Sequence, residues 1–342
     1  MINNTCVKLL QLGYNKEQII KIITKNLNIF TVTTDNIDKK INDLIEMGYN
    51  RDDLYKMIYY FPKIFSYSIN NIRKKVDCII SFGYSFSDVI KMTRIEPSIF
   101  GHSISDLQNK FNYIMELGYS YEETLKIIKF CPMIFTTSFD NLNKKIEKLE
   151  KIGYSKEQIK KMTLKLPSLY CYSFSDNLIP KINYLYLLGF SKEEVIKITV
   201  DFPAIYSYSY EKMNNAIKIL KKFGYDDFEI KKIIFQLPPV FGYSSDNIKR
   251  KLELFSDINL VDTVKKKPKI LMQSCALTYA RYSCLMDMGI DIDSGNCAVL
   301  FEVKSRFEKR SGIKNEDLLK LYNYEEYYNN KHNMQLMVRR KK

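Results

Sequence analysis

Lysine recurs at two fixed positions along the chain, and these ammonium groups are the side chains best placed to do chemistry. One series is Lys40, Lys75, Lys110, Lys145, Lys181 and Lys251, with Ala216 as its single exception. The other is Lys21, Lys56, Lys91, Lys126, Lys161, Lys197 and Lys232, without exception. A lysine-rich composition scatters this residue and does not hold it at one spacing. Regular ammonium groups on a chain with a formal net charge of +14 predict a polyanionic partner.

Glycine marks the period that spaces these lysines. Gly13, Gly48, Gly83, Gly118, Gly153, Gly189 and Gly224 follow one another at intervals of 35 residues, with one step of 36. Such a period is typical of a stacked array of helical units. An aromatic residue and an N-cap residue follow each glycine, and Asp, Glu or Gln stands three positions further on, as in "GYNKEQ" and "GFSKEE". This spacing predicts a capping box at the start of a helix.

Each unit is predicted to hold two helices joined by a short break. A proline fourteen residues after the glycine ends the first helix in six of the seven copies, and a Ser or Thr after an apolar pair caps the second. We therefore expect an all-α superhelical solenoid, of either hand, with about eight ~35-residue repeats over residues 1–289. A degenerate copy is expected at about 254–289, and residues 290–342 are expected to form a helical C-terminal cap and basic tail.

The repeat resembles that of the mitochondrial transcription termination factor (mTERF) family. The resemblance is strongest in "YSFSDNLIPKINYLYLLGFSKEEVIKITVDFPAIYSYS", which has an extra residue before Pro180, and it extends over about residues 5–290. "FEKRSGIKNEDLLKLYNY" also resembles the way such chains end. The resemblance implies a helical superhelix with a basic groove for nucleic acid. It also implies a role in transcription termination or regulation, transcript maturation or ribosome assembly.

The second-helix lysines are predicted to contact phosphates. Several have basic neighbours and no regular acidic partner, and they lie near a helix N-terminus, which favours an incoming phosphate. The predicted nucleic-acid-binding residues are Lys40, Arg73, Lys74, Lys75, Lys110, Lys144, Lys145, Lys181, Arg250 and Lys251. The first-helix lysines often follow an acid by four residues, as in Glu17/Lys21 and Asp52/Lys56, so we expect them to form a solvated, ion-paired face.

A secondary set of candidates follows the apolar pair that ends each break. These residues are Tyr67, His102, Tyr172, Tyr208 and Tyr243, to which Arg306 and Arg310 near the C-terminus are added. A tyrosine at a recurrent loop position could stack on a base. Packing against the neighbouring repeat is the favoured interpretation.

Other classes of function lack a signature. No phosphate-binding glycine loop, zinc-protease motif or catalytic triad is present, so we expect no catalysis, no metal and no cofactor. The seven cysteines form no CxxC pair and are expected to be small buried residues in a reducing intracellular compartment. That compartment would be the cytoplasm or nucleoid as the sequence is written, or a mitochondrial or plastid matrix if a presequence was removed. No apolar run is long enough to span a membrane.

The expected partner is nucleic acid, bound by a monomer. Double-stranded DNA is favoured, with RNA as an alternative in transcript maturation or ribosome assembly. A helical-repeat scaffold that binds proteins is the alternative from another class.

Overall fold

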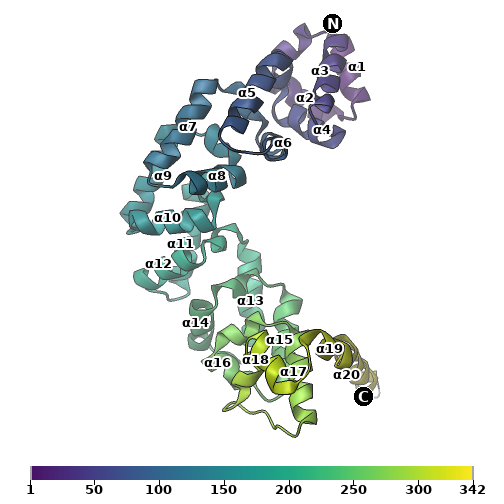
Figure 1. The fold of residues 1–342 in the computed structure, drawn as a ribbon, viewed down its shortest axis with the longest axis vertical. Coiled ribbons are helices and arrows are strands. Elements are labelled where there is room, and N and C mark those ends of the chain that lie inside the picture. Colours follow the sequence, from purple (N-terminus) through teal and green to yellow (C-terminus); the bar gives the residue numbers. More distant parts are fainter. Residues whose placement is uncertain (1, 341–342) are drawn as a thin grey trace. The chain divides into compact units, whose positions relative to one another are not determined.

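The computed structural model describes the backbone of residues 2–340 and the side chains of residues 4–333 (Figure 1). Every regular element within this part of the chain is helical, which confirms the all-α repeat prediction. Each full copy consists of one helix, here called the A helix, then a 3₁₀-helix, then a second helix, here called the B helix. An additional B-type helix, α1 (Ile2–Gln11), precedes the first copy.

The A helices occupy the positions that the capping boxes predict. They are α2 (Lys16–Lys25), α4 (Arg51–Tyr60), α6 (Phe86–Ile95), α8 (Tyr121–Phe130), α10 (Lys156–Lys165), α12 (Lys192–Asp201) and α14 (Asp227–Gln236). The 3₁₀-helices are η1 (Leu27–Thr31), η2 (Pro62–Ser66), η3 (Pro97–Gly101), η4 (Pro132–Phe135), η5 (Pro167–Cys171), η7 (Pro203–Ser207) and η8 (Pro238–Gly242). The B helices are α3 (Thr34–Glu46), α5 (Ile69–Ser81), α7 (Ile104–Glu116), α9 (Phe139–Ile152), α11 (Ile179–Leu187), α13 (Tyr210–Lys222) and α15 (Ser245–Asp257).

Residues in the left-handed backbone conformation follow the B helices, as the glycine period predicts. All seven repeat glycines have positive φ, for example +94° at Gly83. A Cβ atom added at Gly83 would also lie 3.5 Å from the Tyr121 hydroxyl oxygen. The next position of the period is held by Asn259, the single described non-glycine residue with positive φ (55°). Asparagine tolerates this conformation better than other side chains, so the array continues one copy further than the glycines show.

The eighth copy is shortened in its A helix. It contains α16 (Val261–Lys266), η9 (Pro268–Met272) and α17 (Cys275–Asp287). After it come η10 (Cys297–Phe301), α18 (Lys304–Ser311), α19 (Asn315–Leu321) and α20 (Tyr324–Arg340). Helix α20 therefore takes in part of the predicted basic tail, although the side chains of residues 334–342 lie outside the described part.

Like elements of successive copies pack together. A helices contact A helices, B helices contact B helices, and 3₁₀-helices contact 3₁₀-helices, as in α4 with α6, α5 with α7, and η2 with η3. The aromatic residue after each glycine is buried between copies. Tyr14 donates its hydroxyl to Tyr55 O at 2.8 Å, and Tyr84 donates to Leu125 O at 3.0 Å. These tyrosines therefore tie each copy to the A helix of the next.

The described chain divides into two compact units, residues 1–179 and 180–342. The division lies within the fifth copy, where the sequence has one extra residue before Pro180. That residue is accommodated by a π-helical turn, η6 (Phe174–Leu178), directly before α11. A single-residue insertion in a helix commonly produces such a turn, and a proline at the junction further weakens helical hydrogen bonding.

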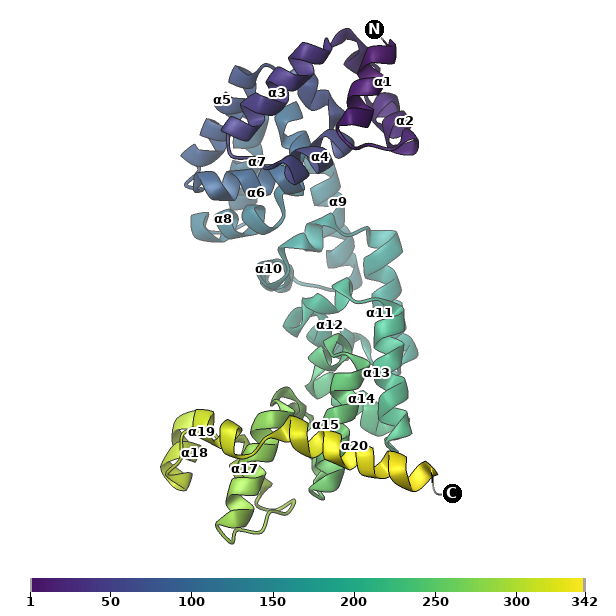
Figure 2. The same cartoon turned by 90° about the vertical axis from the view of Figure 1, so that its right-hand side faces the viewer.

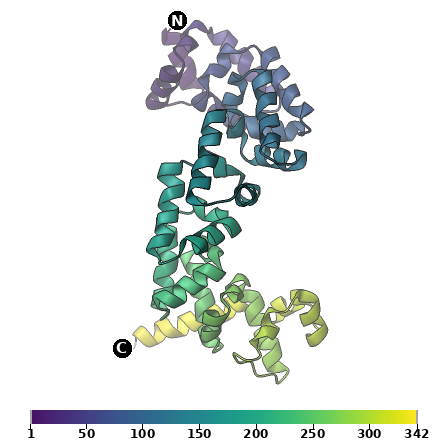
Figure 3. The same ribbon diagram turned by 90° about the vertical axis from the view of Figure 1, so that its left-hand side faces the viewer.

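In the second unit, α20 packs on α17 (Figures 2 and 3). Side chains also join α20 to α15. Lys331 forms an ion pair with Asp257 at 2.5 Å, and Tyr327 donates to the same carboxylate at 2.7 Å. None of the described helices has the length and apolar character needed to cross a bilayer.

Candidate nucleic-acid interface

The B-helix lysines lie between copies and are not on an exposed face. The side chains of Lys75, Lys181 and Lys251 are each 5 % exposed, and Lys110 is 6 % exposed. Lys40 and Lys145 are half-buried. The prediction of a solvent-facing phosphate-binding series is therefore wrong for these six residues, because a buried ammonium group has no free surface to offer a phosphate.

Their partners are backbone carbonyls at the end of the next copy's 3₁₀-helix. The ammonium groups of Lys40, Lys75, Lys145, Lys181 and Lys251 donate to the carbonyls of Tyr67, Phe100, Tyr170, Tyr208 and Gln273, respectively. A helix C-terminus leaves carbonyls unpaired and carries partial negative charge, so a cation is stabilising there. Burial lowers the pKa of all five lysines. The series therefore caps one copy from the copy before it.

Arg281 extends this arrangement beyond the lysine series. It is 1 % exposed and lies on α17 of the shortened eighth copy. Its guanidinium donates to Leu300 O at 2.9 Å and Glu302 O at 2.7 Å, at the end of η10. The sequence did not single out Arg281, because the shortened copy moves it off the 35-residue period.

Lys110 is the member of the series without a carbonyl partner. The following 3₁₀-helix, η4, is one residue shorter than its counterparts, and Thr136 and Thr137 both donate to Met133 O within it. The ammonium group of Lys110 is buried without a hydrogen bond, 3.5 Å from the centre of the Phe139 ring.

Because Lys75 has a carbonyl partner and Lys110 has none, we expect their substitution to affect stability differently. Lys75→Met should lower the free energy of unfolding by about 1–3 kcal/mol, because Phe100 O loses its partner in a buried setting. Lys110→Met should cost less or stabilise, because it removes a buried ammonium group that has no hydrogen bond. Chemical denaturation of both variants measures the contrast. Equal losses would show that the carbonyl bond is not what makes Lys75 important.

The remaining predicted residues of the B helices have mixed placements. Arg73 and Lys74 are exposed, and so is Lys144, which forms an ion pair with Asp140 at 2.7 Å. Arg250 is instead engaged within the protein: it binds both carboxylate oxygens of Glu325 on α20 at 2.9 Å. The prediction of a phosphate contact is therefore wrong for Arg250, whose donors hold the C-terminal helix.

The secondary candidates lie directly after the 3₁₀-helices and are half-buried. Tyr67, His102, Tyr172, Tyr208 and Tyr243 form this set. The Tyr67 ring stacks on Phe61, with centroids 6.2 Å apart, and its hydroxyl lies beside Gly101 of the next copy. This placement agrees with packing between repeats. Arg306 is exposed, whereas Arg310 forms an ion pair with Glu302 at 3.0 Å.

The A-helix lysines have the exposed position that was predicted for them, but most of them lack the expected ion pairs. All seven, from Lys21 to Lys232, are exposed. Among the described carboxylates, none pairs with Lys21, Lys56, Lys91, Lys126 or Lys232. These seven residues are called the A-helix lysine row below. Since the successive A helices of the first unit, from α2 to α10, pack side by side, their ammonium groups form a repeated positive surface.

The capping-box carboxylates of the A helices form ion pairs with basic residues outside the A-helix lysine row. The capping-box acid of one A helix pairs with a base of the next, as in Asp88 with Lys129 at 2.9 Å and Glu194 with Lys231 at 2.9 Å. The same arrangement joins Glu229 to Lys265 at 3.1 Å. The acids therefore stabilise contacts between copies. In the A-helix lysine row, Lys21, Lys56, Lys91, Lys126 and Lys232 keep their charge for another partner.

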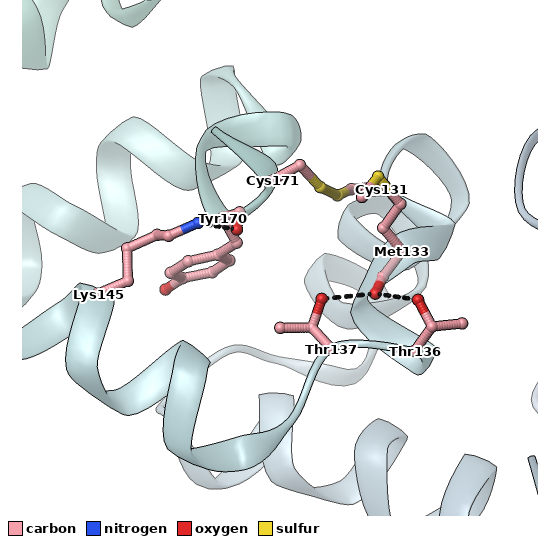
Figure 4. The surroundings of a disulfide bond; sticks show 7 residues. All are labelled: Cys131, Met133, Thr136, Thr137, Lys145, Tyr170 and Cys171. Carbon is pink, nitrogen blue, oxygen red and sulfur yellow. Dashed lines mark hydrogen bonds between the residues drawn. A yellow bond between two sulfur atoms is a disulfide. The ribbon is translucent and has the colours of Figure 1, made fainter. Parts of the chain in front are cut away.

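Cys131 and Cys171 form a disulfide between the fourth and fifth copies (Figure 4). The prediction that every cysteine is reduced is wrong for this pair, while Cys6, Cys78, Cys275, Cys284 and Cys297 are free. Beside the disulfide is a hollow of about 360 Å³, whose lining includes Lys144, Lys145 and Lys148. Figure 4 shows Lys145 reaching Tyr170 next to Cys171. Within the described residues, no cluster of His, Cys, Asp and Glu could hold a metal ion.

Comparison with known proteins assigns the repeat. The mTERF family model matches residues 2–116, 107–222 and 211–299, which together cover most of the chain. A search of curated proteins gives no match. Three consecutive matches in register with the A helix, 3₁₀-helix and B helix show that the chain belongs to the mTERF family.

Proposed function

We propose that this protein binds nucleic acid through its A-helix lysine row, with duplex DNA as the first target, and acts in transcription termination or regulation. Proteins of the mTERF family are helical-repeat proteins that bind nucleic acid and are generally non-catalytic. The observation that carries the proposal is a lysine at one register of seven consecutive A helices, exposed in every copy. No other set of basic residues in the described chain combines regular spacing with exposure.

The spacing of the row suits a phosphate backbone. Packed helices lie about 8–10 Å apart. Phosphates advance about 3.4 Å per step along each strand of a duplex. Successive lysines can therefore meet roughly every third phosphate. Because a lysine ammonium acts as a point charge, these contacts position the backbone and do not read bases.

Salt-dependent binding tests the proposal. A mobility-shift series with duplex DNA, single strands and structured RNA would measure affinity at several salt concentrations. Contacts from the four lysines of the first unit that have no ion pair with a described carboxylate predict a slope of log K against log salt of about −3.6 on duplex DNA. A shallow slope on every nucleic acid would contradict phosphate binding. Tighter binding of structured RNA than of duplex DNA would instead support a function in transcript maturation or ribosome assembly.

Exposed apolar side chains on the same helices favour a second candidate, a scaffold for a protein partner. Tyr60, Ile95 and Phe130 take the same register in three successive A helices and are 64 %, 60 % and 63 % exposed, respectively. Such a row can accept the apolar face of a partner helix. A mainly apolar interface would bind with little dependence on salt, which separates it from phosphate binding.

A further inference from the structure

A second basic feature lies in the shortened eighth copy, away from the A-helix lysine row. The sequence "KKKPK", residues 265–269, runs from the end of α16 into η9. Lys265 pairs with Glu229 at 3.1 Å and Asp262 at 3.4 Å, so it takes up the nearby carboxylates. The side chains of Lys266, Lys267 and Lys269 are exposed, and no described carboxylate pairs with them.

These three lysines line one hollow of about 700 Å³, here called the KKPK pocket. Its lining is of two chemical kinds. Lys266, Lys267 and Lys269 are basic, whereas Met272 and Phe301 are apolar. Met272 is 62 % exposed, although a hydrophobic side chain is more stable when it is buried. The pocket therefore combines strong positive charge with apolar surface.

The arrangement is particular to this copy. The same three positions around the proline hold Phe130, Cys131 and Met133 in the fourth copy, and no other copy has bases at all three. The backbone around the proline is the same as in the seventh copy, where Leu237 has the place of Lys267, so the bases alone distinguish this copy. Three like charges that line one hollow without a carboxylate partner repel one another, so an anion bound there would relieve an unfavourable interaction.

We propose that the KKPK pocket binds a terminal phosphoryl group carried by a nucleotide. A phosphate monoester carries about −1.5 to −2 charges at neutral pH, whereas each phosphodiester of a nucleic-acid backbone carries one. Three ammonium groups around one hollow match the more highly charged group, and a linear row matches the backbone. The apolar lining residues Met272 and Phe301 accept the base or sugar of the same nucleotide. The source is either a free nucleoside triphosphate or the 5′-phosphorylated end of a nucleic-acid strand.

Two binding measurements on the full chain distinguish these sources. The first is titration with ATP and with inorganic triphosphate by calorimetry. The second compares one oligonucleotide with a 5′-phosphate and with a 5′-hydroxyl end in a competition assay. ATP binding without an end preference identifies a free nucleotide, and an end preference without ATP binding identifies a strand terminus. Absence of both would overturn the proposal.

A matched pair of triple variants locates the site. Lys266→Gln, Lys267→Gln and Lys269→Gln together should weaken binding of the preferred probe at least tenfold. Lys192→Gln, Lys218→Gln and Lys222→Gln remove the same charge from exposed positions of the same unit and should change it less than twofold. Equal losses in the two triple variants would mean that general electrostatic attraction accounts for binding, and would also overturn the proposal. Duplex binding with 5′-hydroxyl ends reports separately on the A-helix lysine row.

Discussion

Changing Lys56, Lys91 and Lys126 together to Gln is expected to reduce duplex binding by about two orders of magnitude at physiological salt. Each lost phosphate contact lowers the slope of log K against log salt by about 0.9, so three contacts account for about 2.7. The three side chains are exposed and have no ion pair with a described residue, so their removal should leave the fold intact. The loss should be nearly the same for unrelated duplexes, because these contacts do not read bases.

The comparison variant changes Arg73, Lys74 and Lys144 to Gln. These residues of α5 and α9 were predicted from the sequence to bind phosphate, and they are exposed in the structure. Their substitution removes the same charge from the same unit. They should weaken binding much less, because they lie on the B helices and outside the A-helix lysine row. If this variant lost more of the salt slope than the A-helix variant, the interface would lie on the B helices. Thermal melting of both variants checks that each remains folded.

Steep loss of stability above pH 10 is the second large expected effect. Tyrosine side chains after the repeat glycines are buried, and burial raises the pKa of Tyr14, Tyr49, Tyr84, Tyr119 and Tyr225 above the ordinary value of 10.0. A group whose pKa is raised on folding contributes its full stability below the unfolded pKa and loses it as pH rises through the folded pKa. Between the unfolded and the folded pKa, five such groups lower the free energy of unfolding by about 7 kcal/mol per pH unit. Since domains are stable by about 5–15 kcal/mol, we expect unfolding between about pH 10 and 12.

The buried lysines act in the opposite direction at lower pH. Their pKa is lowered on folding, so their charge weighs against the folded state until pH rises through the interval between the folded and unfolded values. That gain is complete near the ordinary lysine pKa of 10.5, above which the tyrosines dominate. Denaturation curves from pH 8 to 12 should therefore show a rise or plateau followed by a steep fall.

Single substitutions test the tyrosine explanation. Tyr84→Phe keeps the ring but removes one titrating group, so the loss per pH unit should shrink by about 1.4 kcal/mol. Tyr60→Phe, whose ring is 64 % exposed in the folded protein, should leave the pH dependence unchanged. An unchanged slope in Tyr84→Phe would show that alkaline unfolding has another cause.

Local signals in the sequence predicted most of the fold. In the first copy, Asn15 and Gln18 form the reciprocal capping box that starts α2. Proline begins the 3₁₀-helix of every copy after the first, for example at Pro62. These features could be predicted because the interacting groups are a few residues apart. Asn259 was missed because the period was followed only through glycine, although asparagine was the obvious substitute.

The inward position of the B-helix lysines was also present in the sequence. Ile72, Lys75, Val76 and Ile79 follow the i, i+3, i+4, i+7 spacing of one buried helical face. Lys56 lies outside the corresponding apolar set of α4, which includes Leu54, Met57 and Ile58. Both lysine series recur with the same period, and the spacing relative to the apolar residues distinguishes them. A polar residue within a buried stripe should have raised the question of its partner.

Those partners could not be predicted from one copy alone. The carbonyl that Lys75 meets belongs to Phe100, 25 residues further along the chain, and it is left available because a 3₁₀-helix ends there. Which carbonyl lies within reach depends on how two copies stack. The Cys131–Cys171 disulfide joins residues 40 apart and depends on stacking in the same way. Such pairings require the three-dimensional structure.

The capping of most 3₁₀-helices by the preceding B helix gives the array a polarity. Apart from the steps that follow Lys110 and Ala216, a copy donates a hydrogen bond to the copy after it, so the two ends of a copy are not equivalent. An additional copy inserted whole would bring both the acceptor and the donor that its neighbours require. Because the coupling is between nearest neighbours, the number of copies can change without redesign of the remaining interfaces. The length of nucleic acid that such a protein covers can therefore evolve by duplication or deletion of single repeats.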